Sequence, residues 1–300
     1  KAVYPSSVVM NVVPAQVARV PRIAVSSPAQ ENGLPSPSVM ATCALLGIDE
    51  VYGIGGASAI AAFAYGVPEI NLEPVAMVTG PGNIFVAAAK RQLRGVIGID
   101  SEAGPTEILI VADESANPRF IAADLISQAE HDQNAAAVLV TDSASLIEQV
   151  EAELLVQVGL AKNRDRIEAS LGGIQSALVL VTDMSAAMAV ANEYATEHLE
   201  IQTANSEELA NQVRHAGAVF VGAYSPVSLG DYLAGSNHVL PTGQQAKFSS
   251  GLSVFTFLRT QQHVTYSADA LASVTDRLRV FSEAEKLSAH GRAGSIRLEE

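Results

Sequence analysis

Short runs rich in Val and Ile alternate along this chain with Ala-rich helical stretches, and this alternation constrains the fold more than any other feature. In the first third, strands are predicted at residues 22–27, 51–55 and 76–79, and helices near 37–47 and 57–66. A strand–helix–strand order gives parallel strands joined by right-handed crossovers. We therefore predict a parallel sheet within the first hundred or so residues.

The same alternation starts again at residue 106. Buried strands are predicted at residues 106–113, 135–142, 176–183 and 217–222, with helices between them. Two of these strands end in the same Val-Thr-Asp step into a helix, which is a mild echo and not a true repeat. From about residue 253 the strand pattern stops, and the remaining sequence is typical of helices.

These patterns divide the chain into three parts. We predict an α/β protein with two related, incomplete Rossmann-like parallel-sheet domains, residues 1–105 and 106–252, followed by a helical C-terminal tail, residues 253–300. A composition of 48% hydrophobic and 17% charged residues agrees with small-residue helices packed on buried strands. The tail is expected either to pack on its own domain or to reach a second subunit.

Composition also limits the partners and the compartment. A formal net charge of −14 disfavours binding to nucleic acid or anionic lipid, so a small-molecule substrate is expected. No apolar run approaches the roughly 18 residues of a membrane span. The single cysteine, Cys43, cannot form an intrachain disulfide and is expected to pack in a helix, which favours a cytoplasmic location.

A possible metal-ligand pair lies on the helix predicted to begin at Asn117. Gln128 and His131 are three residues apart, so their side chains should emerge on one helical face. This spacing suits two ligands of one metal ion. The alternative is that His131 only interacts favourably with the dipole at the helix C-terminus.

An acid and an imidazole stand side by side where another predicted helix meets a strand-like segment. There, His198 could accept the proton of an alcohol, and Glu197 could activate a water molecule, because burial can raise a Glu pKa toward neutrality. A solvated helix terminus is the alternative interpretation of the same residues.

The segment GDYLAGSNHVLPTG, residues 230–243, is predicted to be a long ordered loop that contains Asp231 and His238. Long loops in compact domains are usually functional or disordered, and the apolar residues of this one favour order. His238 is expected to lie near the site, without an assigned role.

Two glycine turns could hold a dinucleotide. VYGIGGASAIAA leads from a strand into a helix, although Ser58 stands where the third small residue of the usual fingerprint would be. Gly80-Pro81-Gly82-Asn83 precedes another predicted helix, whose N-terminus would favour phosphate. Taken alone, the second turn is better interpreted as an ordinary tight turn.

Eight segments in this order resemble the histidinol dehydrogenase family, which oxidises L-histidinol to L-histidine with two NAD molecules and a zinc ion. The segments are YPSSVVMNVVPA, GIGGASAIAA, GPGNIFVAAAKRQL, GIDSEAGPTEILIVAD, FIAADLISQAEHD, EYATEHLEI, GDYLAGSNHVLPT and EAEKLSAHGRA. The resemblance covers essentially the whole chain. It implies an enzyme of histidine biosynthesis that works as a homodimer, with active sites shared between its subunits.

The resemblance also implies a role for individual residues. The zinc ligands would be Gln128, His131, Asp231 and, from the partner subunit of the dimer, His290. His198 would be the general base and Glu197 the residue that activates water. Substrate would contact the zinc ligands, His198 and two further residues, Thr106 and Glu285. NAD would contact Ser58 and Asn83.

Three departures from the family pattern accompany the resemblance. Ser58 stands in place of a glutamine and Thr106 in place of a serine, and the family's N-terminal segment is expected to be missing. Two other functions therefore stay open. One is a zinc and NAD dehydrogenase of another small polar alcohol, and the other is an inactive truncated fragment that still binds zinc.

Overall fold

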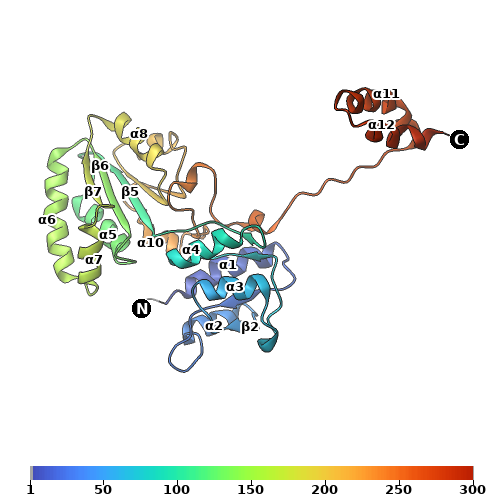
Figure 1. Ribbon diagram of the computed structural model, residues 1–300. Helices are drawn as coiled ribbons and strands as arrows, with labels where there is room; N and C mark the ends of the chain where they lie inside the picture. The colour runs from blue at the N-terminus through green and yellow to red at the C-terminus, as the bar shows by residue number, and fades with distance from the viewer. Residues whose placement is uncertain (1–2, 300) are drawn as a thin grey trace. The chain divides into compact units, whose positions relative to one another are not determined.

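The computed structural model describes residues 3–299 and divides the chain into two compact units, Lys1–Leu258 and Arg259–Glu300, which we describe separately (Figure 1). Unit 1 begins with α1 (Pro5–Val17), β1 (Ala24–Ser26), α2 (Pro37–Leu45), β2 (Glu50–Tyr52), α3 (Ala57–Tyr65), the 3-10 helix η1 (Pro68–Ile70), β3 (Met77–Val78), α4 (Ile84–Leu93) and β4 (Gly98–Ile99). It continues with β5 (Glu107–Ala112), α5 (Pro118–Ala129), β6 (Ala136–Thr141), α6 (Ala144–Leu160), α7 (Arg164–Leu171), β7 (Ala177–Leu180), α8 (Met184–Tyr194), β8 (His198–Gln202), α9 (Ser206–Ala210), β9 (Ala218–Val221), α10 (Val227–Tyr232) and the 3-10 helices η2 (Gln245–Lys247) and η3 (Val254–Phe257).

The first hundred residues form two small parallel pairs, β1 with β2 and β3 with β4, where the sequence predicted one sheet. The paired strands are only two or three residues long, so each pair has few backbone hydrogen bonds between its strands. Packing between helices and strands stabilises this region instead. Cys43 is 1% exposed and packs against Val8, Val12 and Ile48, as expected for a core residue.

Residues 107–221 build the main sheet, in which five parallel strands follow the order β7-β6-β5-β8-β9. The four strands predicted in this region are confirmed as β5, β6, β7 and β9, and the strand-like LEIQ segment is the body of β8. Helices α5, α6 and α10 contribute to the core on one face, whereas α8 and α9 cover the other face. The protein is therefore an α/β protein with parallel sheets, as predicted.

Strand β8 differs from its neighbour β5 because polar and apolar residues alternate along it. Leu199 and Ile201 belong to the apolar core beneath α8, whereas His198, Glu200 and Gln202 point to the opposite face. All five residues of the strand are nevertheless buried. A polar stripe therefore runs through the interior, and each of its groups needs hydrogen-bond partners.

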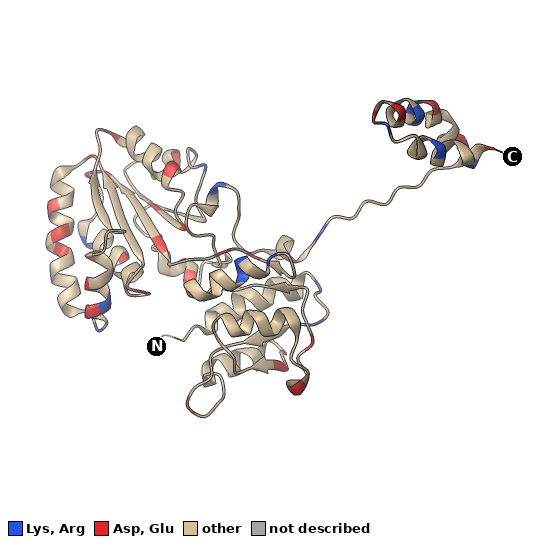
Figure 2. Cartoon of the chain, viewed as in Figure 1, with Lys and Arg blue, Asp and Glu red and all other residues tan. Residues whose placement is uncertain are grey.

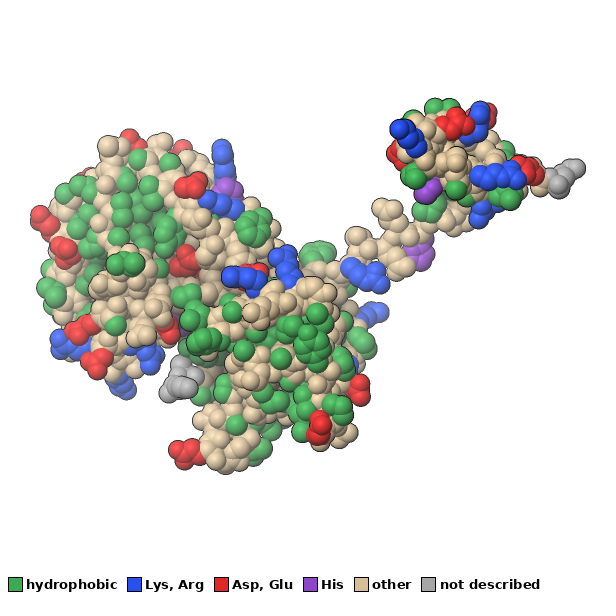
Figure 3. All heavy atoms as spheres, in the orientation of Figure 1, with side chains coloured by type: hydrophobic (Ala, Val, Ile, Leu, Met, Phe, Trp, Pro, Cys, Tyr) green, Lys and Arg blue, Asp and Glu red, His purple; other side chains and the backbone are tan. Residues whose placement is uncertain are grey.

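Burial on the outer part of the sheet decreases toward β7. Leu180, the last residue of this strand, is 55% exposed, and both ends of β7 face solvent. Figure 3 shows hydrophobic side chains gathered over the β6 and β7 side of unit 1. Figure 2 shows acidic residues distributed along α6 and over other elements, so the negative charge of the chain is spread out.

Unit 2 contains α11 (Ala268–Ala284), α12 (Ser288–Ser295) and the 3-10 helix η4 (Ile296–Leu298), which confirms the predicted helices of the tail. Helices α11 and α12 pack so closely at Gly291 that a Cβ atom there would collide with the Ser282 hydroxyl. The role of this unit in dimerisation remains a prediction. Across residues 3–299, no helix is both long and apolar enough to cross a membrane.

Candidate active site

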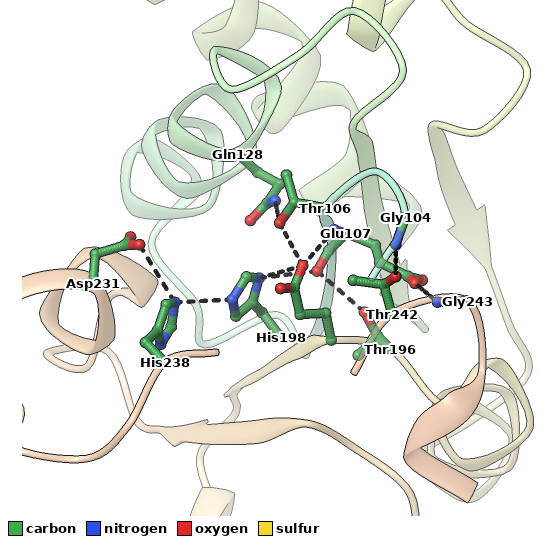
Figure 4. Close-up of polar contacts among 11 residues, drawn as sticks. Gly104, Thr106, Glu107, Gln128, Thr196, His198, Asp231, His238, Thr242 and Gly243 are labelled. Carbon is green, nitrogen blue, oxygen red and sulfur yellow. Dashed lines mark hydrogen bonds and ion pairs between the residues drawn. The ribbon is translucent and has the colours of Figure 1, made fainter. Parts of the chain in front are cut away.

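The candidate site lies at the amino edge of the five-stranded sheet, where β5 and β8 begin side by side. Ile108 of β5 is paired with His198 of β8, so Thr106 and Glu197, each just before its strand, are brought together. Helices run back across a parallel sheet, so the C-terminal end of α5, which carries Gln128, reaches the same edge. Figure 4 shows Thr106, Gln128 and His198 converging from separate elements.

Glu197 is held by two donors from the start of β5. The Thr106 hydroxyl and the Glu107 backbone N–H, which lies 3.1 Å away, both donate to Glu197 Oε2. The residue is 8% exposed, and desolvation raises its pKa to about 8, although these two hydrogen bonds oppose the rise. Near neutral pH this carboxyl group can therefore both hold and release a proton.

His198 is kept neutral by its surroundings. Desolvation lowers its pKa well below 6.5, and the nearby charges of His238 and His131 lower it further. Its Nδ1 atom lies 3.0 Å from the backbone carbonyl oxygen of Glu107. Because a carbonyl oxygen can only accept a hydrogen bond, Nδ1 carries the proton and Nε2 is the acceptor of the ring.

His238 stacks directly on His198. Their ring centroids are 4.7 Å apart with an interplanar angle of 14°, and their Nε2 atoms are 3.0 Å apart. One of these two nitrogens must donate, so His238 Nε2 carries the proton, and Asp231 Oδ1 lies 3.5 Å from the same atom. His238 Nδ1 is then an acceptor, buried and without a hydrogen-bond partner among residues 3–299.

Gln128 is linked to Glu197 through Thr106. Its Nε2 atom donates to Thr106 Oγ1 over 2.6 Å, and that hydroxyl in turn donates to the carboxylate of Glu197. The amide nitrogen of Gln128 is thereby occupied, which leaves its carbonyl oxygen available. Only this oxygen of a neutral amide can coordinate a metal ion.

Two details of the predicted site are wrong. Helix α5 ends at Ala129, so His131 lies in the following turn and does not share a helical face with Gln128. The chain turns there because Asp132 and Asn134 form a local side-chain hydrogen bond that competes with the helix. The ring of His131 instead stacks on Tyr4 of the N-terminal region, with centroids 6.5 Å apart.

The second detail concerns residues 230–243, which do not form one long loop. Helix α10 extends to Tyr232, so Asp231 projects from the last turn of a short helix. Apolar Val227 starts this helix and packs in the core, which explains why the helix forms despite its glycine. His238 lies in the ordered segment that follows.

The two residues predicted to contact NAD both lie at helix N-termini. Ser58 is exposed in the first turn of α3, after Gly56 with φ +69°. Asn83 is the N-cap of α4, and its Oδ1 accepts from the N–H groups of Phe85 and Val86. This cap is a structural role for Asn83, and a contact with NAD remains a prediction for both residues.

Glu285 and His290 belong to unit 2, where both are exposed. Glu285 follows the last residue of α11, and His290 lies in the first turn of α12. Their contribution to the site therefore remains a prediction.

Sequence reasoning missed Glu107 as a site residue and assigned no role to His238. Three groups of Glu107 make hydrogen bonds in the site. Its carbonyl oxygen accepts from His198, its N–H donates to Glu197, and its side chain accepts from Gly243 N–H. Its signal in the sequence is an acidic first residue in an otherwise apolar strand, EILIVA.

The donors of the site suit a zinc ion. In the part of the chain that the structure describes, no three His, Cys, Asp or Glu side chains form a metal-binding group by themselves. The predicted zinc ligands do not require such a group within unit 1. Only two of them in this unit, His131 and Asp231, are of these four residue types. His131 and Asp231 are donors of types that zinc prefers. The carbonyl oxygen of Gln128 is a further oxygen donor, because its amide nitrogen already donates to Thr106.

A parallel α/β fold with a buried acid–imidazole pair at a sheet edge defines a class of protein suited to acid–base chemistry. Comparison with known proteins makes the assignment specific, because the family described as histidinol dehydrogenase matches residues 1–298. The chain belongs to the histidinol dehydrogenase family.

Individual relatives agree with this assignment. A histidinol dehydrogenase of Thermobifida fusca is 62% identical over 300 residues, which cover 99% of this chain and 68% of that protein. One from Leifsonia xyli subsp. xyli is 58% identical, over 100% of this chain and 69% of that protein. The crystal structure of histidinol dehydrogenase from Elizabethkingia anophelis superimposes with a TM-score of 0.93 at 34% identity, covering 99% of this chain and 68% of that one.

Proposed function

We propose that this chain oxidises L-histidinol through L-histidinal to L-histidine, with two molecules of NAD as the oxidant. The observation that carries the proposal is the pairing of a neutral, oriented imidazole, His198, with a carboxyl group of raised pKa, Glu197, in a chain 62% identical to a histidinol dehydrogenase. The two groups suit the two half-reactions. The domain division at residues 105 and 252 is part of this proposal.

In the first half-reaction His198 acts as the base. Its Nε2 lone pair accepts the hydroxyl proton of the alcohol while the carbinol hydrogen leaves as hydride to NAD, giving the aldehyde and NADH. The Glu107 carbonyl stabilises the imidazolium that results, because it already accepts from Nδ1. His238 donates to Nε2 before substrate binds, so it must yield this position to the hydroxyl.

In the second half-reaction Glu197 activates water. Its carboxylate takes a proton as the water oxygen bonds to the aldehyde carbon, and the hydrate then loses a second hydride to a second NAD. Only an ionised carboxylate can accept this proton, and with a pKa of about 8 a fraction of Glu197 is ionised near that pH. Thr106 and the Glu107 N–H hold the carboxylate in place.

Zinc would be held by Gln128, His131 and Asp231, with His290 supplied by a second copy of the chain. When bound, zinc supplies a positive charge that can hold the nitrogen atoms of histidinol and orient the alcohol carbon toward nicotinamide. Thr106 and Glu285 would complete the contacts with substrate, and Ser58 and Asn83 would contact NAD. The shared site makes the active form a homodimer.

The experiment is NADH production by the zinc-loaded chain with L-histidinol as substrate. Two NADH per L-histidinol consumed supports the proposal. Turnover of another small polar alcohol but not of L-histidinol would show that the other alcohol is the substrate. No NADH with any alcohol, although zinc is bound, would contradict the enzymatic function.

A further inference from the structure

A buried polar network lies next to the site, formed by Asp124, Glu200 and Gln202, and neither half-reaction uses it. The three residues are 9%, 1% and 4% exposed, respectively. Gln202 Nε2 donates to Glu200 Oε2 over 2.8 Å and to Asp124 Oδ2 over 3.2 Å. Polar groups of this kind are costly to bury in an apolar core unless they are hydrogen-bonded, so each of these bonds constrains the elements that it joins.

The network joins the three elements that carry the central site residues. Glu200 lies two residues after His198 on the same face of β8, and Asp124 lies four residues before Gln128, one turn away on α5. The third link runs to α10. Glu200 Oε1 accepts from the backbone N–H of Val227 over 2.9 Å, and Asp231 follows Val227 by one helical turn.

Helix α10 depends on this link for its cap. The residue before the helix is Pro226, whose side chain has no group that can accept a hydrogen bond. The first N–H groups of a helix need acceptors, and Glu200 provides one of them from the neighbouring strand. The position at which α10 starts, and hence the position of Asp231, is thus set by a side chain of the strand that carries His198.

Burial in a shared apolar environment makes both carboxyl groups harder to ionise. Desolvation raises the pKa of Asp124 to about 6 and the pKa of Glu200 well above its ordinary value, and the charge of Asp124 adds to the rise for Glu200. A hydrogen bond between the two carboxyl groups becomes possible when one of them is protonated.

We infer that Glu200, bridged to Asp124 by Gln202, is a positioning residue that fixes Asp231 on α10 relative to His198 on β8 and Gln128 on α5. The inference rests on the proposed function in one respect, because the geometry it sets is that of the proposed zinc ligands. Polar groups that support metal ligands typically change metal affinity by about 10-fold to 100-fold when they are removed.

The test compares three variants of the full chain. Glu200→Leu removes both acceptors at similar volume, whereas Glu200→Gln keeps an acceptor for Val227 N–H. Ile201→Val is the matched control, because Ile201 is fully buried on the opposite face of the same strand. Two quantities are measured, namely zinc affinity by competition with a chromophoric chelator, and amide hydrogen exchange of Val227–Tyr232 in the metal-free chain.

We expect Glu200→Leu to weaken zinc binding by about tenfold or more and to accelerate exchange across α10. Glu200→Gln and Ile201→Val should both stay close to the wild-type values. If Glu200→Leu does not fold, Gln202→Met is measured instead, and it should weaken zinc binding by about tenfold, because it removes both hydrogen bonds that Gln202 donates.

Unchanged zinc affinity and unchanged exchange of α10 in the folded variant would overturn the inference. Equal losses in Glu200→Leu and Ile201→Val would also overturn it, because they would indicate general destabilisation. A wild-type chain that does not bind zinc would contradict the proposed function instead, and hydrogen exchange in the metal-free chain would then decide the positioning role alone.

Discussion

The Nδ1 atom of His198 lies 3.0 Å from the backbone carbonyl oxygen of Glu107, and this contact determines which nitrogen of the ring can act as a base. The carbonyl belongs to the backbone, so no side-chain substitution at position 107 removes it. The contact therefore fixes the tautomer through the fold itself. It leaves Nε2, the atom that faces His238, to accept a proton.

Replacing His238 should change the acidity of His198. His238→Asn removes a titratable ring whose electrostatic interaction lowers the pKa of His198, so that pKa should rise, although burial remains the larger cause of its low value. A base works only when it is unprotonated, so the acidic limb of the pH profile of kcat/KM should move to higher pH. The control is His215→Asn, since His215 binds the backbone of Asn192 away from the site. An acidic limb that stays in place in both variants would refute this electrostatic role.

Thr106 should tune Glu197 through its hydroxyl group. Thr106→Val removes a hydrogen bond that lowers the pKa of Glu197, so that pKa should rise above about 8. Oxidation of L-histidinal should then require a higher pH and slow by about threefold to tenfold near neutrality, the effect of one lost hydrogen bond. Thr106→Ser keeps the hydroxyl and should behave like the wild type. Equal rates in the Val and Ser variants across the pH range would show that the hydrogen bond from Thr106 does not tune the pKa of Glu197.

Glu197 should be needed for the second oxidation more than for the first. The carboxylate must be ionised to take a proton from water, so oxidation of added L-histidinal should speed up as pH rises through about 8. Glu197→Gln should lower this rate by about 10²-fold to 10⁴-fold, the usual effect of losing a general base. Single-turnover measurements with L-histidinol and with L-histidinal separate the two steps. An equal loss in both steps would contradict the division of roles.

The sequence predicts the elements of the main sheet well because its strands are long and apolar. Strands such as EILIVA and AAVLVT are buried at every position and could be recognised from composition alone. The two-residue and three-residue strands before residue 100 have too few hydrogen bonds for a pattern to show how they pair. Helix α1, with Pro14 inside it, was not predicted either.

The site residues required a different kind of information. Adjacent residues such as Glu197 and His198 could be identified as an acid–base pair because the junction between a helix and a strand brings them to an edge. The partnership of His198 with His238, 40 residues away, depends on how α10 and the following segment fold back. The role of the Glu107 carbonyl was not visible in the sequence, because it depends on the register between β5 and β8.

A buried ion pair should stabilise the turn that contains Gly80. Lys90 Nζ lies 2.6 Å from Asp100 Oδ1, with side chains 2% and 4% exposed, and both residues also bind the backbone of Gly80. Lys90→Met leaves a buried carboxylate unpaired and should lower the free energy of unfolding by about 3–5 kcal/mol. Chemical denaturation measures this change.

The adjacent residue offers a matched control for this prediction. Arg91 pairs with Glu102 at 2.7 Å, but its side chain is 70% exposed. Arg91→Met should therefore cost less than about 1 kcal/mol. Similar losses in the two variants would mean that burial does not determine the strength of the Lys90 pair.

Zinc content tests the central claim most directly, because the proposed site joins Gln128, His131 and Asp231 to His290 of a second copy. Elemental analysis of the chain, purified without chelators, should find one zinc ion per chain in the wild type. Asp231→Ala and His290→Ala should each retain much less zinc, whereas His215→Ala should retain all of it. One zinc ion per chain in all four proteins, or none in the wild type, would contradict the account.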